Sequence, residues 1–272
     1  MSYLPLIARV DSLPPLPESV LKIEELFAQG DPDIDKLVEI IKKDPSLTTD
    51  ILSKVNAPFY GFSKTIVSIL QAVTLFGSSQ IRSIVLASSI QRSFDIDLSP
   101  YSITTSEFSK ISTMQSELIF QWYMGINIDI ARTITPIAFL MEMGKILIAK
   151  DILQNKKEDE FLSDLSKYED ISYVENIYTM MSSAQINALI FKHLNLNSTF
   201  SECMKYLDSE YETPQNISDM VTALQIVRKA INIKDQLTDY SINNAVKLLK
   251  QNNYNVNAFQ RAAKRVKIRY LD

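Results

Sequence analysis

The chain has 272 residues, and 46% of them are hydrophobic, which is enough to bury a core of one large domain or two smaller ones. Five glycines are too few for glycine-rich phosphate loops or for β architectures with many tight turns, so the composition favours an all-α protein. The formal net charge of −4 disfavours nucleic-acid binding by bulk electrostatics. A single cysteine, Cys203, allows no internal disulfide, and we expect a soluble cytoplasmic protein.

Residues 14–94 are predicted to form about five short helices in series. Asp44 followed by Pro45 is a typical helix start, because the carboxylate caps free N–H groups and proline suits the first helical position. The pair Asp31 and Pro32 predicts the same kind of start for the preceding helix. Between these starts, apolar residues recur at helical spacing, which indicates that each helix buries one face.

The second part of the chain is also predicted to be helical. A long helix is expected from Ser106 through Trp122, and Thr135 with Pro136 predicts the start of the helix IAFLMEMGKILIA. In that segment one acid, Glu142, stands among apolar residues. Further helices are predicted near residues 180–194, 216–233, 239–251 and 257–270.

Three segments resemble, in order, the motifs of one family: LPPLPESV, IIKKDPSLTTDILSKVNAPFYGFSKTIVSILQAVTLFGSSQIRSIVLAS and AFLMEMGKILIA. The family is that of HDOD domains, the HD-related output domains of bacterial signalling proteins. The resemblance covers residues 12–235 and implies an all-α, HD-related fold of two packed helical lobes. We expect an N-terminal lobe of about 1–95, an HD-like lobe of about 100–235, and C-terminal helices in 236–272 packed on the HD-like lobe.

The resemblance also locates a degenerate site. Where true HD enzymes have His-Asp-x-Gly, this chain has Met141, Glu142, Met143 and Gly144. A thioether is a poor ligand for hard cations, and HD sites need several histidines, whereas this chain has one histidine in total. We therefore expect no catalytic residues, no bound metal and no cofactor, and a metal phosphohydrolase is disfavoured.

Two side chains leave alternatives open. Glu142 could be a residual ligand or a buried acid. The favoured interpretation is an acid that faces solvent or meets Lys145 or another basic group across a turn. His193 could sense pH or interact with the dipole of its helix, but the favoured interpretation is an ordinary surface or core histidine, because metal ligands occur in clusters. The methionines near the degenerate site are expected to fill the core, although they could also form an adaptable groove.

The tail AFQRAAKRVKIRY carries an apolar face and a basic remainder. The favoured interpretation is a last helix docked by its apolar side chains. The functional alternative is a face that binds an anion or a partner. The candidate residues for that face are Arg261, Lys264, Arg265, Lys267 and Arg269.

The leading functional prediction is a non-catalytic regulatory protein of bacterial signal transduction that acts through protein–protein contacts. The resemblance implies a partner in a two-component or cyclic-di-GMP pathway, and no membrane insertion is expected. Two alternatives remain. One is a sensor that binds a small ligand or nucleotide in the vacated HD cavity, lined by Met141 and its neighbours. The other is nucleic-acid binding through the basic C-terminal helix, which the overall charge disfavours.

Overall fold

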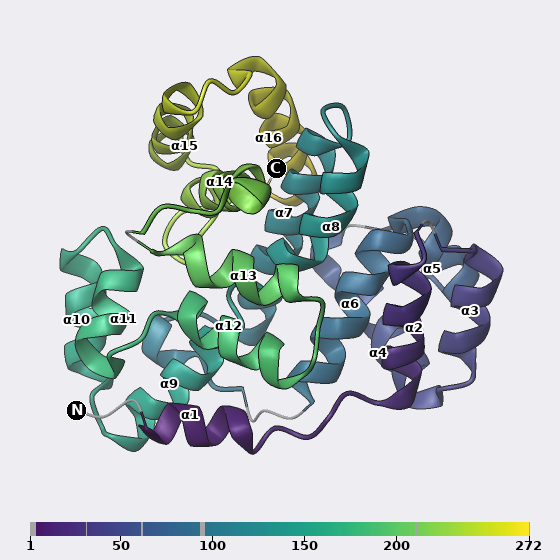
Figure 1. The fold of residues 1–272 in the computed structure, drawn as a ribbon, viewed down its shortest axis with the longest axis horizontal. Helices are drawn as coiled ribbons and strands as arrows, with labels where there is room; N and C mark the ends of the chain where they lie inside the picture. Colours follow the sequence, from purple (N-terminus) through teal and green to yellow (C-terminus); the bar gives the residue numbers. More distant parts are fainter. Residues whose placement is uncertain (1–3, 31, 61, 93–95, 210, 272) are drawn as a thin grey trace.

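The computed structural model describes residues 4–271 apart from 31, 61, 93–95 and 210. These residues form sixteen α-helices and two short 3-10 helices, and among them the only β-type pairing is an isolated bridge between Ile231 and Gln236. The prediction of an all-α fold is confirmed (Figure 1). In chain order the helices are α1 Leu4–Asp11, α2 Glu18–Ala28, α3 Ile34–Lys42, α4 Pro45–Val55, η1 Pro58–Tyr60, α5 Ile69–Phe76, α6 Ser78–Gln91, η2 Ser99–Tyr101, α7 Thr105–Tyr123, α8 Ile128–Leu140, α9 Gly144–Gln154, α10 Glu158–Lys167, α11 Ile171–Thr179, α12 Ser183–His193, α13 Ser198–Leu207, α14 Gln215–Ala230, α15 Asp239–Gln251 and α16 Val256–Tyr270.

The five helices predicted for residues 14–94 are α2 to α6. Asp44 caps α4 and Pro45 is its first residue, as predicted. The helix before it, α3, begins later than predicted: Asp33 is its cap and accepts a hydrogen bond from the Asp35 N–H at 2.9 Å. Asp31, the predicted cap, lies outside the described residues. Asp33 can cap α3 because its carboxylate stands two residues before a free N–H group and can reach it.

Helix α6 joins the first helices to the rest of the chain. It packs against α2, α4 and α5, and also against α8. Eleven of the twelve residues 79–90 are buried, all except Arg82, and they surround the helix axis. Helix α6 is therefore a core helix rather than an amphipathic surface helix. The core is therefore continuous across this junction.

The second half of the chain is arranged around α7, which packs against α8, α14 and α16. Helices α12 and α13 pack against each other, and α12 also packs against α9. The first helix, α1, lies against this second half of the chain, where it packs on α9 and α12 (Figure 1). At the other end of the chain, α16 contacts both α7 and η1. The boundaries predicted for the two lobes remain predictions.

Candidate functional site

The segment IAFLMEMGKILIA spans two helices and the turn between them. Helix α8 ends at Leu140 and α9 begins at Gly144. The start predicted at Thr135 and Pro136 is wrong, because α8 already begins at Ile128 and Pro136 lies inside it. The reason is local: the Thr135 hydroxyl donates to the Ala131 carbonyl at 2.6 Å within the helix, so it is not a cap.

The turn between α8 and α9 carries Glu142 into the interior. The Glu142 side chain is 1% exposed, so the interpretation that it faces solvent is wrong. The alternative contact with Lys145 is confirmed, with Lys145 Nζ 3.0 Å from Glu142 Oε2. Gln115 of α7 donates through Nε2 to Glu142 Oε1 at 3.0 Å and to the Ile231 carbonyl at 2.9 Å. Burial of this carboxylate is thus compensated by charged and polar neighbours from other helices.

Lys145 connects the turn to α11 and α12. Its Nζ lies 2.7 Å from Glu175 Oε1 and donates to Ser183 Oγ at 2.9 Å. The Ser183 N–H donates to Glu175 Oε2 at 2.6 Å, and the Tyr101 hydroxyl donates to Glu175 Oε1 at 3.0 Å. Lys145 and Glu175 are almost completely buried, and an unpaired buried charge is costly. The ion pair between them offsets this cost for both side chains.

Arg228 of α14 completes the site from the opposite side. Its Nε lies 3.2 Å from Glu142 Oε1, and its two terminal nitrogens donate to Asp208 at 2.7 Å and to Ser183 Oγ at 3.0 Å. Five charged groups therefore meet here, and we call them the charge cluster: Glu142, Lys145, Glu175, Asp208 and Arg228. Three formal negative charges and two formal positive charges leave the cluster at −1.

The pKa values follow from this arrangement. Burial opposes ionisation of Glu142, but Lys145 and Arg228 outweigh it and lower the pKa to about 2. In the same way burial at Asp208 is outweighed by Arg228, and the pKa of Asp208 is lowered. Burial, reinforced by Glu175, raises the pKa of Tyr101 well above its ordinary value. Tyr101 is therefore a neutral donor to the cluster at physiological pH.

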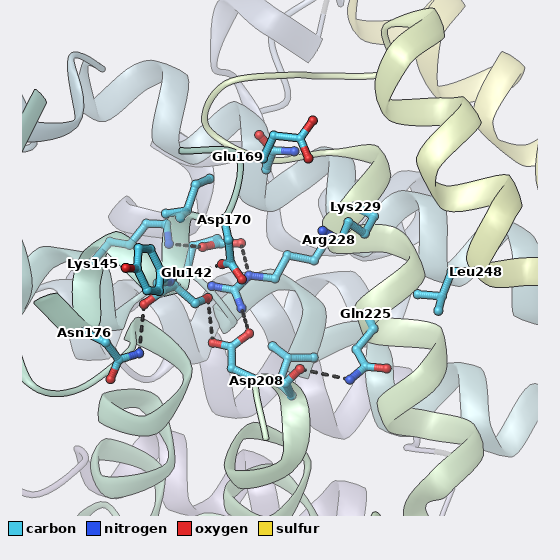
Figure 2. A pocket seen from close by; sticks show the side chains of 15 residues that line it. Glu142, Lys145, Glu169, Asp170, Asn176, Asp208, Gln225, Arg228, Lys229 and Leu248 are labelled. Carbon is cyan, nitrogen blue, oxygen red and sulfur yellow. Dashed lines mark hydrogen bonds and ion pairs between the residues drawn. The ribbon is translucent and has the colours of Figure 1, made fainter. Parts of the chain in front are cut away.

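A cavity of about 600 Å³ opens beside the charge cluster (Figure 2). Glu142, Lys145, Asp208 and Arg228 line it, and Figure 2 shows their side chains converging from separate elements. Met141 does not line the cavity, so the prediction that it would is wrong. Its side chain is fully buried in the core, because the turn directs Glu142 rather than Met141 toward the opening. The remaining lining residues are Glu169, Asp170, Ile171, Ser172, Tyr173, Asn176, Leu207, Gln225, Lys229, Asn232 and Leu248.

The chemistry of this site is that of a compensated ion cluster. The carboxylates of Glu142, Glu175 and Asp208 each contact an ammonium or guanidinium group of the protein itself. Among the residues that the structure describes, no group of three or more His, Cys, Asp and Glu side chains is placed to hold a metal ion. The described donor set therefore does not fit the metal that an HD site requires.

The single histidine lies at the end of α12. His193 Nε2 is 2.9 Å from the Leu13 carbonyl, and the ring is half-buried. It does not line the cavity of the charge cluster. The predicted ordinary role, which here is a contact between α12 and the segment after α1, is consistent with this position.

The basic tail lies apart from the charge cluster. The apolar face of α16 is buried as predicted, and it consists of Phe259, Ala262, Ala263, Val266 and Tyr270. Arg261, Lys264, Arg265 and Arg269 are exposed and Lys267 is half-buried. Arg269 lies 3.2 Å from Glu117 of α7. Binding of an anion or partner by these five residues remains a prediction.

The sequence matches the HDOD domain family over residues 13–210. The chain belongs to the HDOD domain family. A solved virulence factor from Campylobacter jejuni subsp. jejuni is similar in structure, with a TM-score of 0.60 and 26% identity over 99% of this chain and 97% of that protein. Membership of this family fits a regulatory role.

Two further solved structures share the fold. One is described as a candidate signal transduction protein from Marinobacter aquaeolei VT8, with a TM-score of 0.70 and 18% identity over 96% of this chain and 58% of that one. The other is described as a candidate phosphohydrolase from Shewanella amazonensis SB2B, with a TM-score of 0.66 and 16% identity over 95% of this chain and 93% of that one. A curated but uncharacterized protein of Treponema pallidum (strain Nichols) is 33% identical over 69 residues, which are 25% of this HDOD chain and 14% of that protein.

The length and hydropathy of the helices bear on whether any of them could span a membrane. Within the described residues of this HDOD protein, no helix by itself is both long and apolar enough to cross a bilayer. Only α5 and α6 taken together reach that length and composition, and they are bent by 118° where they meet.

Proposed function

We propose that this HDOD protein is a non-catalytic regulatory protein that acts through contacts with a protein partner in a signalling pathway. The observation that supports the absence of catalysis is the position of two cationic side chains. Lys145 Nζ lies 3.0 Å from Glu142 and 2.7 Å from Glu175, and Arg228 bridges Glu142 and Asp208. Carboxylates that already neutralise buried cations of the protein are poor candidates to hold a further divalent ion.

Turnover assays test this proposal. Phosphomonoesters, phosphodiesters, nucleotides and cyclic dinucleotides should remain intact after incubation of the purified protein with Mn²⁺ or Mg²⁺. Hydrolysis that co-purifies with the protein and disappears in both Glu142→Ala and the milder Asp208→Asn would contradict the proposal. Asp164→Asn, a change at an acid that pairs with Lys167 at 3.1 Å on the surface, is the matched control.

The cavity beside the charge cluster favours a second candidate function, the sensing of a small ligand or nucleotide. Its volume of about 600 Å³ lies in the range of small-molecule sites. Polar groups at its floor, including Lys145 and Arg228, would orient a ligand, and Tyr173 at its wall offers an aromatic face. Thermal melts with a panel of nucleotides and cyclic dinucleotides check this. A rise in the melting temperature that Tyr173→Ala abolishes would support sensing, and a flat response across the panel would count against it.

A further inference from the structure

A second hollow shares no lining residue with the cavity beside the charge cluster. It has a volume of about 340 Å³, and its apolar walls come from the end of α5, from α7 and from the start of α8. These walls are formed by Leu75, Phe76, Phe120, Met124 and Ile128. We call this hollow the α5–α8 groove.

The apolar side chains around the groove are unusually accessible. Leu75 is 49% exposed, Met124 is 52% exposed and Ile128 is 39% exposed. Single exposed apolar residues are ordinary, but three that surround one hollow form a patch of the kind that marks interaction surfaces. The segment that supplies Leu75 has no charged residue from Thr65 to Ile81, so α5 offers no salt bridge of its own to a partner.

The charge at the groove comes from its other walls and is mainly positive. Arg132 and Arg269 line it together with one acid, Glu117, which is 3.2 Å from Arg269. On α16, Arg261, Arg265 and Arg269 follow one another at intervals of four residues. Residues at this spacing lie along one side of a helix, so the three arginines form a basic stripe that reaches the groove at Arg269.

We propose that the α5–α8 groove binds an acidic amphipathic segment of a protein partner. Apolar side chains of that segment would fill the hollow between Leu75, Met124 and Ile128, and its carboxylates would lie along the arginine stripe of α16. This is the helix-in-groove mode of recognition, with complementary charge at the rim. The inference rests on the proposed function, because it names the surface and the partner chemistry through which the protein would act.

A protein segment can match both the apolar groove and the arginine stripe, whereas nucleic acid can match only the stripe. Phosphates would pair with Arg261 and Arg265, but a phosphodiester backbone would leave the exposed Leu75 and Met124 side chains in water. An acidic amphipathic segment covers the apolar side chains and pairs with the arginines at the same time.

Site-specific photo-crosslinking in the native cell tests the proposal. A benzophenone amino acid replaces Leu75 in the groove or, as the matched control, Ile177 of α11, which is exposed to a similar extent at 44%. Mass spectrometry then identifies the crosslinked segment. The expected result is that position 75 captures a segment with net negative charge and with apolar residues at helical spacing, at a yield at least tenfold above position 177.

The basic stripe is tested in the same crosslinking protein. Arg261→Glu with Arg265→Glu should lower the yield at position 75 at least tenfold. Lys205→Glu with Lys247→Glu, which reverses two exposed charges on α13 and α15, should leave the yield unchanged. Circular dichroism melts of both double variants, expected to match the parent protein, confirm that any loss arises at the surface.

The remaining outcomes overturn the proposal in distinguishable ways. Capture at position 177 but not at position 75 would overturn the groove while leaving the protein-contact function intact. Capture of a second copy of this chain, or of a basic segment, would refute the proposed partner chemistry. DNA binding that the arginine reversals abolish and Leu75→Ser leaves unchanged would assign the stripe to nucleic acid. If neither position 75 nor position 177 captures a protein segment, and the purified protein shows metal-dependent hydrolysis, both the groove proposal and the proposed function would be overturned.

Discussion

Gly144 and Ser183 approach so closely that no side chain fits between them. A Cβ atom at Gly144 would lie 2.1 Å from the Ser183 carbonyl oxygen. This approach brings the start of α9 onto the start of α12 and places Ser183 Oγ 2.9 Å from Lys145 and 3.0 Å from Arg228. Gly144 therefore has a packing role, because the absence of a side chain there allows the contact on which the charge cluster is built.

Gly144→Ala is expected to destabilise the protein by about 3 kcal/mol, because the added methyl group must displace backbone rather than a flexible side chain. Urea denaturation followed by circular dichroism measures the free energy of unfolding. Gly125→Ala is the matched control, since a Cβ at Gly125 meets no atom within 4 Å. Equal stability of the two variants would mean that α9 and α12 separate easily.

Met141 is expected to behave as core. Because its side chain is fully buried, Met141→Ala should lower the free energy of unfolding by roughly 2–5 kcal/mol. Met141→Leu, which nearly conserves volume, should cost less than about 1.5 kcal/mol. Met141→His should bind no metal, since the other histidine ligands of an HD site are absent from the sequence.

Met124→Ala provides the comparison for an exposed methionine, with an expected change within about 0.5 kcal/mol. Denaturant melts of the alanine and leucine variants, with a calorimetric titration of Mn²⁺ into Met141→His, give the required measurements. A neutral Met141→Ala would contradict the core assignment and would indicate that the side chain has a different role.

The helices were largely predictable from the sequence, because their signals are local. Asp44 and Pro45 specify a helix start through atoms only a few residues apart, and the structure begins α4 there. The false start at Thr135 and Pro136 shows the limit of such signals. Proline is acceptable in the first turn, but the earlier cap Asn127 accepts hydrogen bonds from the N–H groups of Asp129 and Ile130, so the helix begins before the proline.

The charge cluster was only half predictable. Glu142 and Lys145 are only three residues apart, so their contact across a turn could be expected from the sequence. Arg228 is 86 residues from Glu142, and only tertiary packing brings α14 against the turn. A signal was nevertheless present: Arg228 falls on the apolar stripe of its helix, with Leu224 four residues before it and Ile231 three residues after it. A charged residue on a buried stripe indicates a buried partner of opposite charge.

Arg228→Lys is expected to be disruptive although it conserves charge. The guanidinium group contacts Glu142, Asp208 and Ser183 at once, a fork geometry that one ammonium group cannot reproduce. We expect a loss of about 2 kcal/mol in the free energy of unfolding, since at least one charge-assisted hydrogen bond is lost. Lys229→Arg, at the adjacent position on the rim of the cavity, is the control and should change stability by less than about 0.5 kcal/mol. Equal melts for the two variants would indicate that the cluster adapts to a smaller cation.

The free energy of unfolding should depend on pH through the protonation of Glu142. Its pKa is about 2 in the folded protein and about 4.3 in an unfolded chain, so its contribution is fully present above about pH 5 and is lost as the pH falls toward 2. The difference of roughly two pKa units corresponds to about 3 kcal/mol. Glu142→Gln removes this titration and leaves Lys145 and Arg228 with fewer counter-charges, so at pH 7 the variant should be less stable by roughly 3–5 kcal/mol.

The decisive measurement is the gap between the wild-type protein and Glu142→Gln along a pH series. Because protonation of Glu142 abolishes the same interactions that the substitution removes, the gap should narrow by about 3 kcal/mol between pH 5 and pH 2. Glu202→Gln, at an exposed acid on α13, should follow the wild-type curve throughout. A constant gap from pH 7 to pH 2 would show that Glu142 is not held as a carboxylate by Lys145 and Arg228, and the electrostatic account of the charge cluster would then be wrong.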